Sequence, residues 1–275
     1  MNTENYVLSE KLENLLKLRT YPIALKLLKS EDEIPEDAIR PKRDLGFHLA
    51  LCQAFGIVRR GGLLKLTEGK EEGEKPIIAM LKEDMWCFEP VIGYGMAEAP
   101  EYFLEGHNRY PADVASLEAG AYWAQHEFPR LPYGHSIGVL LSPLRLANFD
   151  PDVVIIYGNP LQVTLLTFAS SYYTGKDIHA SLSGHAACVY AVVPVIKENE
   201  AKIILPCQGD RRHGTTQDDE LTFSFPYSKL KEIVEALEIL AEKEARRIPF
   251  RVDIHPEYTL RETYRKIGRM IGMDI

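Results

Sequence analysis

The sequence predicts an α/β or α+β fold in which helices pack on a mixed β-sheet. The chain has 275 residues, of which 45% are hydrophobic and 26% are charged, and these values are typical of a folded protein. Short apolar runs alternate with longer stretches whose apolar residues have helical spacing. No low-complexity linker interrupts this alternation, so residues 1–275 are predicted to form a single domain.

Six segments have the pattern of β-strands. Residues 21–28 alternate apolar side chains with a period of two, as a strand with one buried face does. Continuous apolar runs at residues 137–142 and 153–157 are typical of strands that are buried on both faces. Three shorter runs complete the set, at residues 76–82, 202–205 and 221–225.

Helices are predicted between and around these strands. Ser9 precedes an apolar stripe of Leu12, Leu15 and Leu16 and is suited to cap that helix. Pro160 favours the first turn of a helix that runs to about residue 173. Further helices are predicted at residues 45–58, 113–128, 183–193 and 229–247, and polar connections at residues 30–44 and 66–75.

The charge balance excludes some classes of partner. The formal net charge is −8, which disfavours binding to nucleic acid through phosphate neutralisation. The N-terminal segment lacks the pattern of a secretory signal, and the apolar runs are far shorter than the ~20 residues of a membrane helix. We therefore expect a cytoplasmic protein with no nucleic-acid or membrane partner, and its size is typical of a homo-oligomer.

The four cysteines admit two interpretations. They are Cys52, Cys87, Cys188 and Cys207, and no Cys-x-x-Cys motif occurs. Cytoplasmic thiols stay reduced, so a structural disulfide is the least expected role. Four thiolates are the usual ligand set of a zinc site or an iron–sulfur cluster. Free cysteines are also common as small buried hydrophobic residues, and the spacing alone favours this second interpretation.

The cysteines also follow a repeated pattern. A cysteine in a predicted helix, a buried strand and a cysteine in the following turn occur in this order twice, first with Cys52 and Cys87 and then with Cys188 and Cys207. This repetition suggests the hypothesis of two pseudo-symmetric halves.

The segment PCQGDRR carries several residues suited to a site. Cys207 directly follows a predicted strand, a common place for ligand-binding groups. Gly209 permits close approach of a ligand to the backbone, and Asp210 is a potential acceptor. Arg211, Arg212 and His213 form a cationic cluster that would hold an anionic substrate or lower the pKa of the neighbouring thiol. The alternative is a surface turn held by ion pairs.

Two further residues lie at predicted helix starts. His185 precedes Cys188 by three residues and shares its helical face, so it is a potential ligand, a proton carrier or a surface histidine. Gln162 either points into a cleft or caps its helix together with Asn159. No phosphate-binding glycine motif, nucleophile elbow, HExxH or EF-hand pattern occurs.

Six segments of the chain form a specific combination: YPIALKLL, LCQAFG, WCFEPVIGYG, PLRLANFDPDVVIIYGNPLQ, GHAACV and ILPCQGDRR. Together they resemble the DUF169 family, which occurs in archaea and anaerobic bacteria. The resemblance covers residues 21–226 and leaves residues 229–275 as a C-terminal helical segment. It favours a cysteine-built site in an oxygen-averse cell and implies no particular reaction. The positions that match its motifs are Cys52, Cys87, Gln162, Cys188, Cys207, Gly209, Asp210 and Arg211.

These observations lead to one main hypothesis and two alternatives. In the main hypothesis the four cysteines hold an iron–sulfur cluster, or zinc in its place, for redox or small-molecule chemistry in anaerobic metabolism. A small anionic molecule or a redox partner would bind beside it. The alternatives are a metal-free enzyme with a reactive cysteine beside Arg211, and a non-catalytic binding or assembly subunit. The candidate substrate-binding residues are Gln162, Gly209, Arg211 and His213, and the candidate catalytic residues are Asp210, Arg211 and His185.

Overall fold

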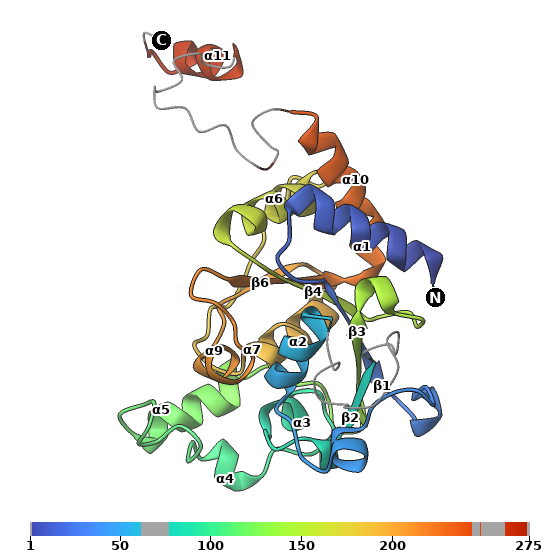
Figure 1. Ribbon diagram of the computed structural model, residues 1–275. Coiled ribbons are helices and arrows are strands. Elements are labelled where there is room, and N and C mark those ends of the chain that lie inside the picture. Colours follow the sequence, from blue (N-terminus) through green and yellow to red (C-terminus); the bar gives the residue numbers. More distant parts are fainter. Residues whose placement is uncertain (1, 62–76, 244–247, 249–261, 274–275) are drawn as a thin grey trace.

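The structure is a computed structural model that describes residues 2–61, 77–243, 248 and 262–273. A six-stranded sheet lies at its centre, with the strand order β2-β3-β1-β4-β6-β5 (Figure 1). Every pair of neighbouring strands is antiparallel, so the predicted α+β class is confirmed with an antiparallel sheet in place of a mixed one. The strands are β1 (Ile23–Leu28), β2 (Ile78–Leu81), β3 (Gly138–Pro143), β4 (Val153–Gly158), β5 (Lys202–Ile204) and β6 (Leu221–Pro226).

The six predicted strands all occur. The apolar run that predicted β4 is buried along its whole length, as expected for a strand covered on both faces. Polar residues at both ends of such a run limit how far the strand can shift along its neighbours without burying them.

The strand order repeats in the two halves of the sheet. In each half the first strand lies at the centre (β1 or β4), the third lies next to it (β3 or β6) and the second forms the edge (β2 or β5). The edge strands are therefore the ones that lead into the segments of Cys87 and Cys207. A twofold relation between the halves stays a prediction.

Three long helices cover one face of the sheet. They are α1 (Thr3–Leu16), α6 (Pro160–Ser171) and α10 (Leu230–Ala241), which lie side by side in Figure 1. Their apolar side chains pack on Val154, Ile156, Phe223 and Phe225 of β4 and β6. Because side chains alternate along a strand, the residues between these point to the opposite face.

The opposite face carries shorter helices. They are α2 (Leu51–Arg59), α3 (Glu89–Gly93), α7 (Ala187–Tyr190) and α8 (Val193–Glu198), packed on the inward side chains of β1 to β5. Three more short helices border this layer: α4 (Glu101–Leu104), α5 (Leu117–Tyr122) and α9 (Gln208–His213). The loops between them position the candidate site. The C-terminal helix α11 (Glu262–Met270) completes the set within the described residues.

Some helices are shorter than the sequence predicted. The helix expected at 45–58 begins at Leu51, because Gly46 takes a positive φ of 78° and ends a separate π-helical turn over Pro41–Leu45. The helix expected at 183–193 begins only after Ala186, which has a φ of 50°. The predicted polar connection at 66–75 lies outside the described residues, as does part of the helix expected at 229–247.

None of the helices in the described part of the chain combines the length and the apolar character that crossing a membrane would require.

Gln162 has a structural role on the face covered by the long helices. It forms a capping box with Asn159, in which Gln162 N–H donates to Asn159 Oδ1 at 3.0 Å and Asn159 N–H donates to Gln162 Oε1 at 2.7 Å. Gln162 Nε2 also donates to the carbonyl oxygens of Leu16 and Lys17, at 2.9 and 3.0 Å. These bonds join the start of α6 to the end of α1.

We expect Gln162→Ala to lower the free energy of unfolding by about 2 kcal/mol, because it removes a cap and leaves two carbonyl groups without a partner. Urea unfolding measures this loss. Thr164→Ala, on the exposed side of the same helix, is the matched control and should cost less than about 0.5 kcal/mol. Equal losses in the two variants would show that the hydrogen bonds of the Gln162 side chain do not hold α1 and α6 together.

Candidate functional site

A cavity of about 310 Å³ lies where α2, α3, α7 and α9 approach one another, and all four cysteines line it. We call it the cysteine pocket. Cys87 and Cys207 follow the two edge strands, whereas Cys52 and Cys188 belong to α2 and α7. The remaining lining residues are Ala50, Trp86, Phe88, Glu89, Asn108, Arg109, Asp113, Gly184, His185, Ala186, Gln208, Gly209 and His213.

The cysteines do not form the predicted metal centre. Within the described residues, no three His, Cys, Asp or Glu side chains are arranged so that they could hold a metal ion. Several of the sulfur atoms are instead bound to the backbone. Leu51 N–H donates to Cys87 Sγ at 3.3 Å, and Asp210 N–H donates to Cys207 Sγ at 3.4 Å. The prediction of a four-cysteine iron–sulfur or zinc protein is therefore wrong.

Burial keeps three of the thiols protonated. It raises the pKa of Cys87 to about 12, and it also raises the pKa of Cys52 and Cys188, where nearby ionisable groups act in the same direction. Cys52 Sγ in addition donates to the carbonyl oxygen of Gly209 at 3.5 Å. Protonated thiols are poor nucleophiles, so these three cysteines contribute apolar, polarisable walls to the pocket.

The predicted site residues fall into two groups. Gly209, His213 and His185 line the cysteine pocket. Gln162 lies on the opposite face of the sheet, in the capping box described above. Arg211 is not a lining residue, because its Nη1 donates to the carbonyl oxygen of Gln217 at 2.8 Å and pairs with Asp218. The alternative of a reactive cysteine beside Arg211 therefore has no support in this arrangement.

Arg109 supplies the cationic group of the pocket, and the sequence analysis missed it. Its guanidinium lies 4.0 Å above the ring of Trp123, and Nη1 is 3.3 Å from an oxygen of Asp113. The residue is only 6% exposed, and its Nε has no hydrogen-bond partner among the described residues. Residues 97–112 show no clear periodicity in the sequence, so no signal marked Arg109 for this position.

Other polar groups of the pocket also lack partners. Asn108 Oδ1 is buried without a hydrogen bond in the part of the chain that the structure describes. Burial raises the pKa of Glu89, whereas the charge of Arg109 opposes this shift. Since buried polar groups are nearly always paired in native proteins, the unpaired Asn108 Oδ1 and Arg109 Nε cost free energy at the wall of this pocket.

Aromatic rings border the same cavity. Trp86 and Phe88 are both about half exposed, and the Trp86 ring meets the His213 imidazole edge-on at 5.2 Å. Burial and the charge of Arg109 lower the pKa of His185, whereas Asp113 opposes this effect. The pocket thus combines aromatic side chains at its border with one arginine, Arg109, in its wall.

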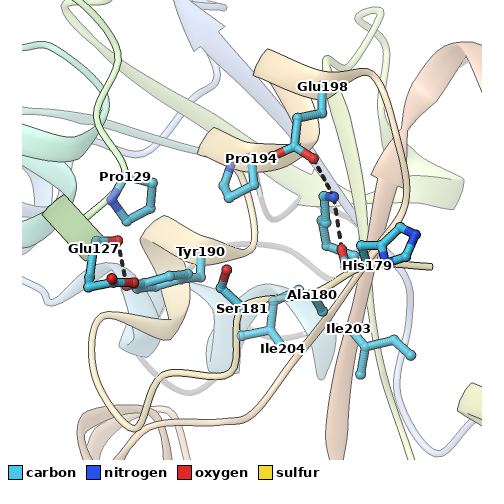
Figure 2. A pocket seen from close by; sticks show the side chains of 11 residues that line it. Glu127, Pro129, His179, Ala180, Ser181, Tyr190, Pro194, Glu198, Ile203 and Ile204 are labelled. Atoms are coloured by element: carbon cyan, nitrogen blue, oxygen red, sulfur yellow. Dashed lines mark hydrogen bonds and ion pairs between the residues drawn. The ribbon is translucent and has the colours of Figure 1, made fainter.

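A second cavity of about 290 Å³ lies beside the edge strand β5 (Figure 2). Its buried cation, Lys202, is already paired, because Nζ donates to the carbonyl oxygen of His179 at 2.9 Å and to Glu198 Oε2 at 2.5 Å. Tyr190 in the same cavity donates its hydroxyl hydrogen to the carbonyl oxygen of Glu127. Because these groups are already paired, they are less available to a ligand than the polar groups of the cysteine pocket.

A buried polar network supports the pocket from behind. The Tyr157 hydroxyl donates to the Asp210 carboxylate at 3.2 Å, and the Arg59 guanidinium stacks on the Tyr157 ring at 4.1 Å. Arg59 is fully buried and forms two 2.9 Å hydrogen bonds with Glu220. Asp210 therefore faces the protein interior, three residues after Cys207, and positions α9.

The fold and the pocket define an α+β protein with a thiol-lined cavity. The chain belongs to the DUF169 family, described as "Uncharacterised ArCR", whose profile matches residues 11–236. It is 35% identical over 98 residues to the uncharacterized protein MJ0308 of Methanocaldococcus jannaschii. That alignment covers 35% of this chain and 42% of the relative, so the chain spans less than half of the relative's length. No solved structure matches the chain.

Slow alkylation should distinguish the buried thiols. At about pH 7.5, iodoacetamide should modify Cys52, Cys87 and Cys188 in the native protein at least about tenfold more slowly than in the urea-unfolded protein, because little thiolate is present. Peptide mass spectrometry of timed samples gives the rate at each cysteine. A native rate close to the unfolded rate at any of the three would contradict the raised pKa values.

The stability of the protein should depend on Asp210 between about pH 4 and pH 6. Burial raises the pKa of Asp210 to about 6, although Tyr157 and Arg59 oppose the shift. The folded state therefore retains a proton that the unfolded chain releases, and the contribution of this group to stability falls as the pH rises through that window, by at most about 3 kcal/mol.

Asp210→Asn should remove this decrease, since an amide does not titrate. The test is urea unfolding of both proteins at several pH values from about 4 to about 7. The difference between variant and wild type should grow in favour of the variant as the pH rises. Asp218→Asn, at a fully exposed position, is the matched control, and a similar pH trend in that variant would refute the assignment to Asp210.

Proposed function

We propose that the protein binds a small organic carboxylate in the cysteine pocket. The observation that carries this proposal is the position of Arg109, a cation that is only 6% exposed, lines the cavity and pairs with Asp113 through Nη1. A guanidinium matches the geometry of a carboxylate and forms charge-assisted hydrogen bonds with it. Asn108, next to it in the chain, also lines the cavity, and the N–H groups of its side-chain amide are donors suited to a carboxylate.

The size and the border of the pocket support an organic ligand. A volume of about 310 Å³ is at the lower end of the range for small-molecule sites. Trp86 and Phe88 offer flat apolar surfaces at the border, and the protonated thiols supply soft contacts deeper in the cavity. A carboxylate bound to Arg109 would therefore carry its apolar part toward the aromatic rings.

The acidic residues of the pocket limit the charge of the ligand. An oxygen of Asp113 already lies 3.3 Å from Arg109 Nη1 and offsets part of the arginine charge. The charge that remains therefore matches a ligand with one carboxylate group and not several. Glu89 also lines the cavity, and burial raises the pKa of its carboxyl group, whereas a backbone hydrogen bond and the charge of Arg109 oppose this shift. The cytoplasmic location, the homo-oligomer and the anaerobic context that the sequence suggested stay predictions.

Intrinsic fluorescence offers a direct test, because the chain has two tryptophans and both belong to the site. Trp86 lines the pocket, and Trp123 stacks on Arg109. Titration with acetate, succinate and benzoate should change the emission, with benzoate binding most tightly because its ring meets the aromatic border. Arg109→Gln should weaken binding of the tightest probe at least about tenfold.

Arg211→Gln is the matched control, since Arg211 is the arginine that the sequence favoured and it lies outside the pocket. Its affinity should stay within about twofold of the wild type. Circular dichroism of Arg109→Gln checks that the variant is folded. No saturable response to any of the three acids, or equal losses in the two variants, would refute the proposal.

A further inference from the structure

The C-terminal helix α11 is amphipathic, and its apolar side is exposed. Tyr264 and Ile267 lie on this side with Met270 beside them, and between 59% and 73% of each of these residues is exposed. Ile271 directly follows the helix and extends the apolar side, because its N–H donates to the carbonyl oxygen of Ile267 at 3.2 Å. A helix of nine residues is marginal in water by itself, so α11 depends on packing of this side against another surface.

The other side of α11 is basic. It carries Arg265, Lys266 and Arg269 against one acidic residue, Glu262. This local excess of positive charge occurs in a chain whose formal net charge is −8. The counterpart that matches both sides of the helix is therefore an acidic surface with exposed apolar groups.

The helices α4 and α5 carry a surface of this kind. Residues 98–127 contain six acidic residues, all of them exposed, and one basic residue, Arg109, which is buried. Tyr102 of α4 is 66% exposed and Tyr122 of α5 is 59% exposed. We call this region the acidic aromatic surface and define it by Glu101, Tyr102, Glu105, Glu118 and Tyr122.

Close packing joins α4 to α5. Gly106, just after α4, lies so near α5 that a Cβ at this position would be 2.3 Å from the backbone nitrogen of Ala121. The Phe103 ring of α4 meets the Trp123 ring, directly after α5, at 6.1 Å. The exposed tyrosines and carboxylates of the two helices therefore belong to one packed unit.

The α11 of the same chain is poorly placed to reach this surface. α10 and the pair of α4 and α5 lie at opposite ends of the molecule (Figure 1). Twenty residues separate Ala241, the end of α10, from Glu262, and they span at most about 70 Å when fully extended. The path over the surface of a protein of this size is about as long. Docking within one chain would thus require a fully extended link, whereas a second copy meets no such constraint.

We propose that α11 of one copy docks on the acidic aromatic surface of a second copy. Two copies that lie side by side in opposite directions exchange their helices reciprocally, which gives a closed dimer with twofold symmetry. The apolar side of α11 packs on Tyr102 and Tyr122, and its basic side faces the carboxylates around them. This contact is independent of the ligand of the cysteine pocket.

Analytical ultracentrifugation of the full chain tests the proposal. Wild type should sediment as a dimer at about 10 μM. Ile267→Asp should weaken the dimer at least about tenfold, because it places a carboxylate in the apolar contact. Val7→Asp changes another exposed apolar residue, on α1, and its dimer affinity should stay within about twofold of the wild type. A monomeric wild type, or equal losses in the two variants, would overturn the proposal.

Charge reversal tests the pairing of the two surfaces. Arg265→Glu combined with Arg269→Glu should weaken the dimer at least about tenfold, because each docked helix then faces like charges. Glu101→Lys combined with Glu105→Lys should do the same. The chain with all four changes should recover the wild-type affinity to within about threefold, which a variant that merely folds poorly would not do. Failure to recover would overturn the assignment of α11 to this surface.

Lipid vesicles separate this contact from binding to a membrane surface, which basic amphipathic helices also mediate. Wild type should stay in the supernatant when vesicles of phosphatidylglycerol and phosphatidylcholine are sedimented at about 0.15 M salt. Sedimentation of the wild type with the vesicles, and its loss in Ile267→Asp, would assign α11 to a lipid surface and overturn the proposal.

Discussion

The buried ion pair between Arg59 and Glu220 holds together the parts of the molecule that form one wall of the cysteine pocket. It joins the last turn of α2 to the segment that leads from α9 into β6. Burial alone would raise the pKa of Glu220, but the hydrogen bonds and the charge of Arg59 lower it. Removal of either partner would leave an uncompensated buried charge, at a cost of about 3–5 kcal/mol. The pair therefore fixes α2 relative to α9.

Two glycines near this pair, Gly56 and Gly214, have no room for a side chain. A Cβ at Gly56 of α2 would lie 2.6 Å from the carbonyl oxygen of Gly214, and a Cβ at Gly214 would lie 2.5 Å from an oxygen of Asp210. Only glycine permits this approach. Because α2 and the turn after α9 touch through backbone atoms, Cys52 and Gly209 meet at hydrogen-bonding distance on the wall of the cysteine pocket.

Apolar patterning predicted the sheet well, because burial on one or both faces imposes a signal on every residue of a strand. The site was predicted only in part. His185, Gly209 and His213 were identified from their place after strands and at helix starts, and they line the cysteine pocket. Arg109 lies in a segment of short turns, where neither the helical nor the strand periodicity applies. Its burial over Trp123 depends on tertiary contacts that the local pattern of the sequence does not reveal.

Gln162 illustrates a second limit. A glutamine at the third position of a helix fits a capping box and a ligand contact equally well, and only the position of the α1 terminus decides between them. The cysteines show a related ambiguity. The strands that precede Cys87 and Cys207 lie at opposite edges of the sheet, so the convergence of the cysteines on one cavity depends on the loops and short helices that cross its face. Convergence does not by itself create ligand geometry among the described residues.

The shortness of those edge strands also affects how copies of the chain can meet. β2 has four residues and β5 has three, so each edge offers few free backbone groups for another strand. The outer edge of β2 is in addition partly occupied, because Ile39 forms backbone hydrogen bonds with Ile77 and Ala79. Continuation of the sheet from one molecule into the next is thus disfavoured, which protects the protein against open-ended aggregation and leaves the helical surfaces for any contact between copies.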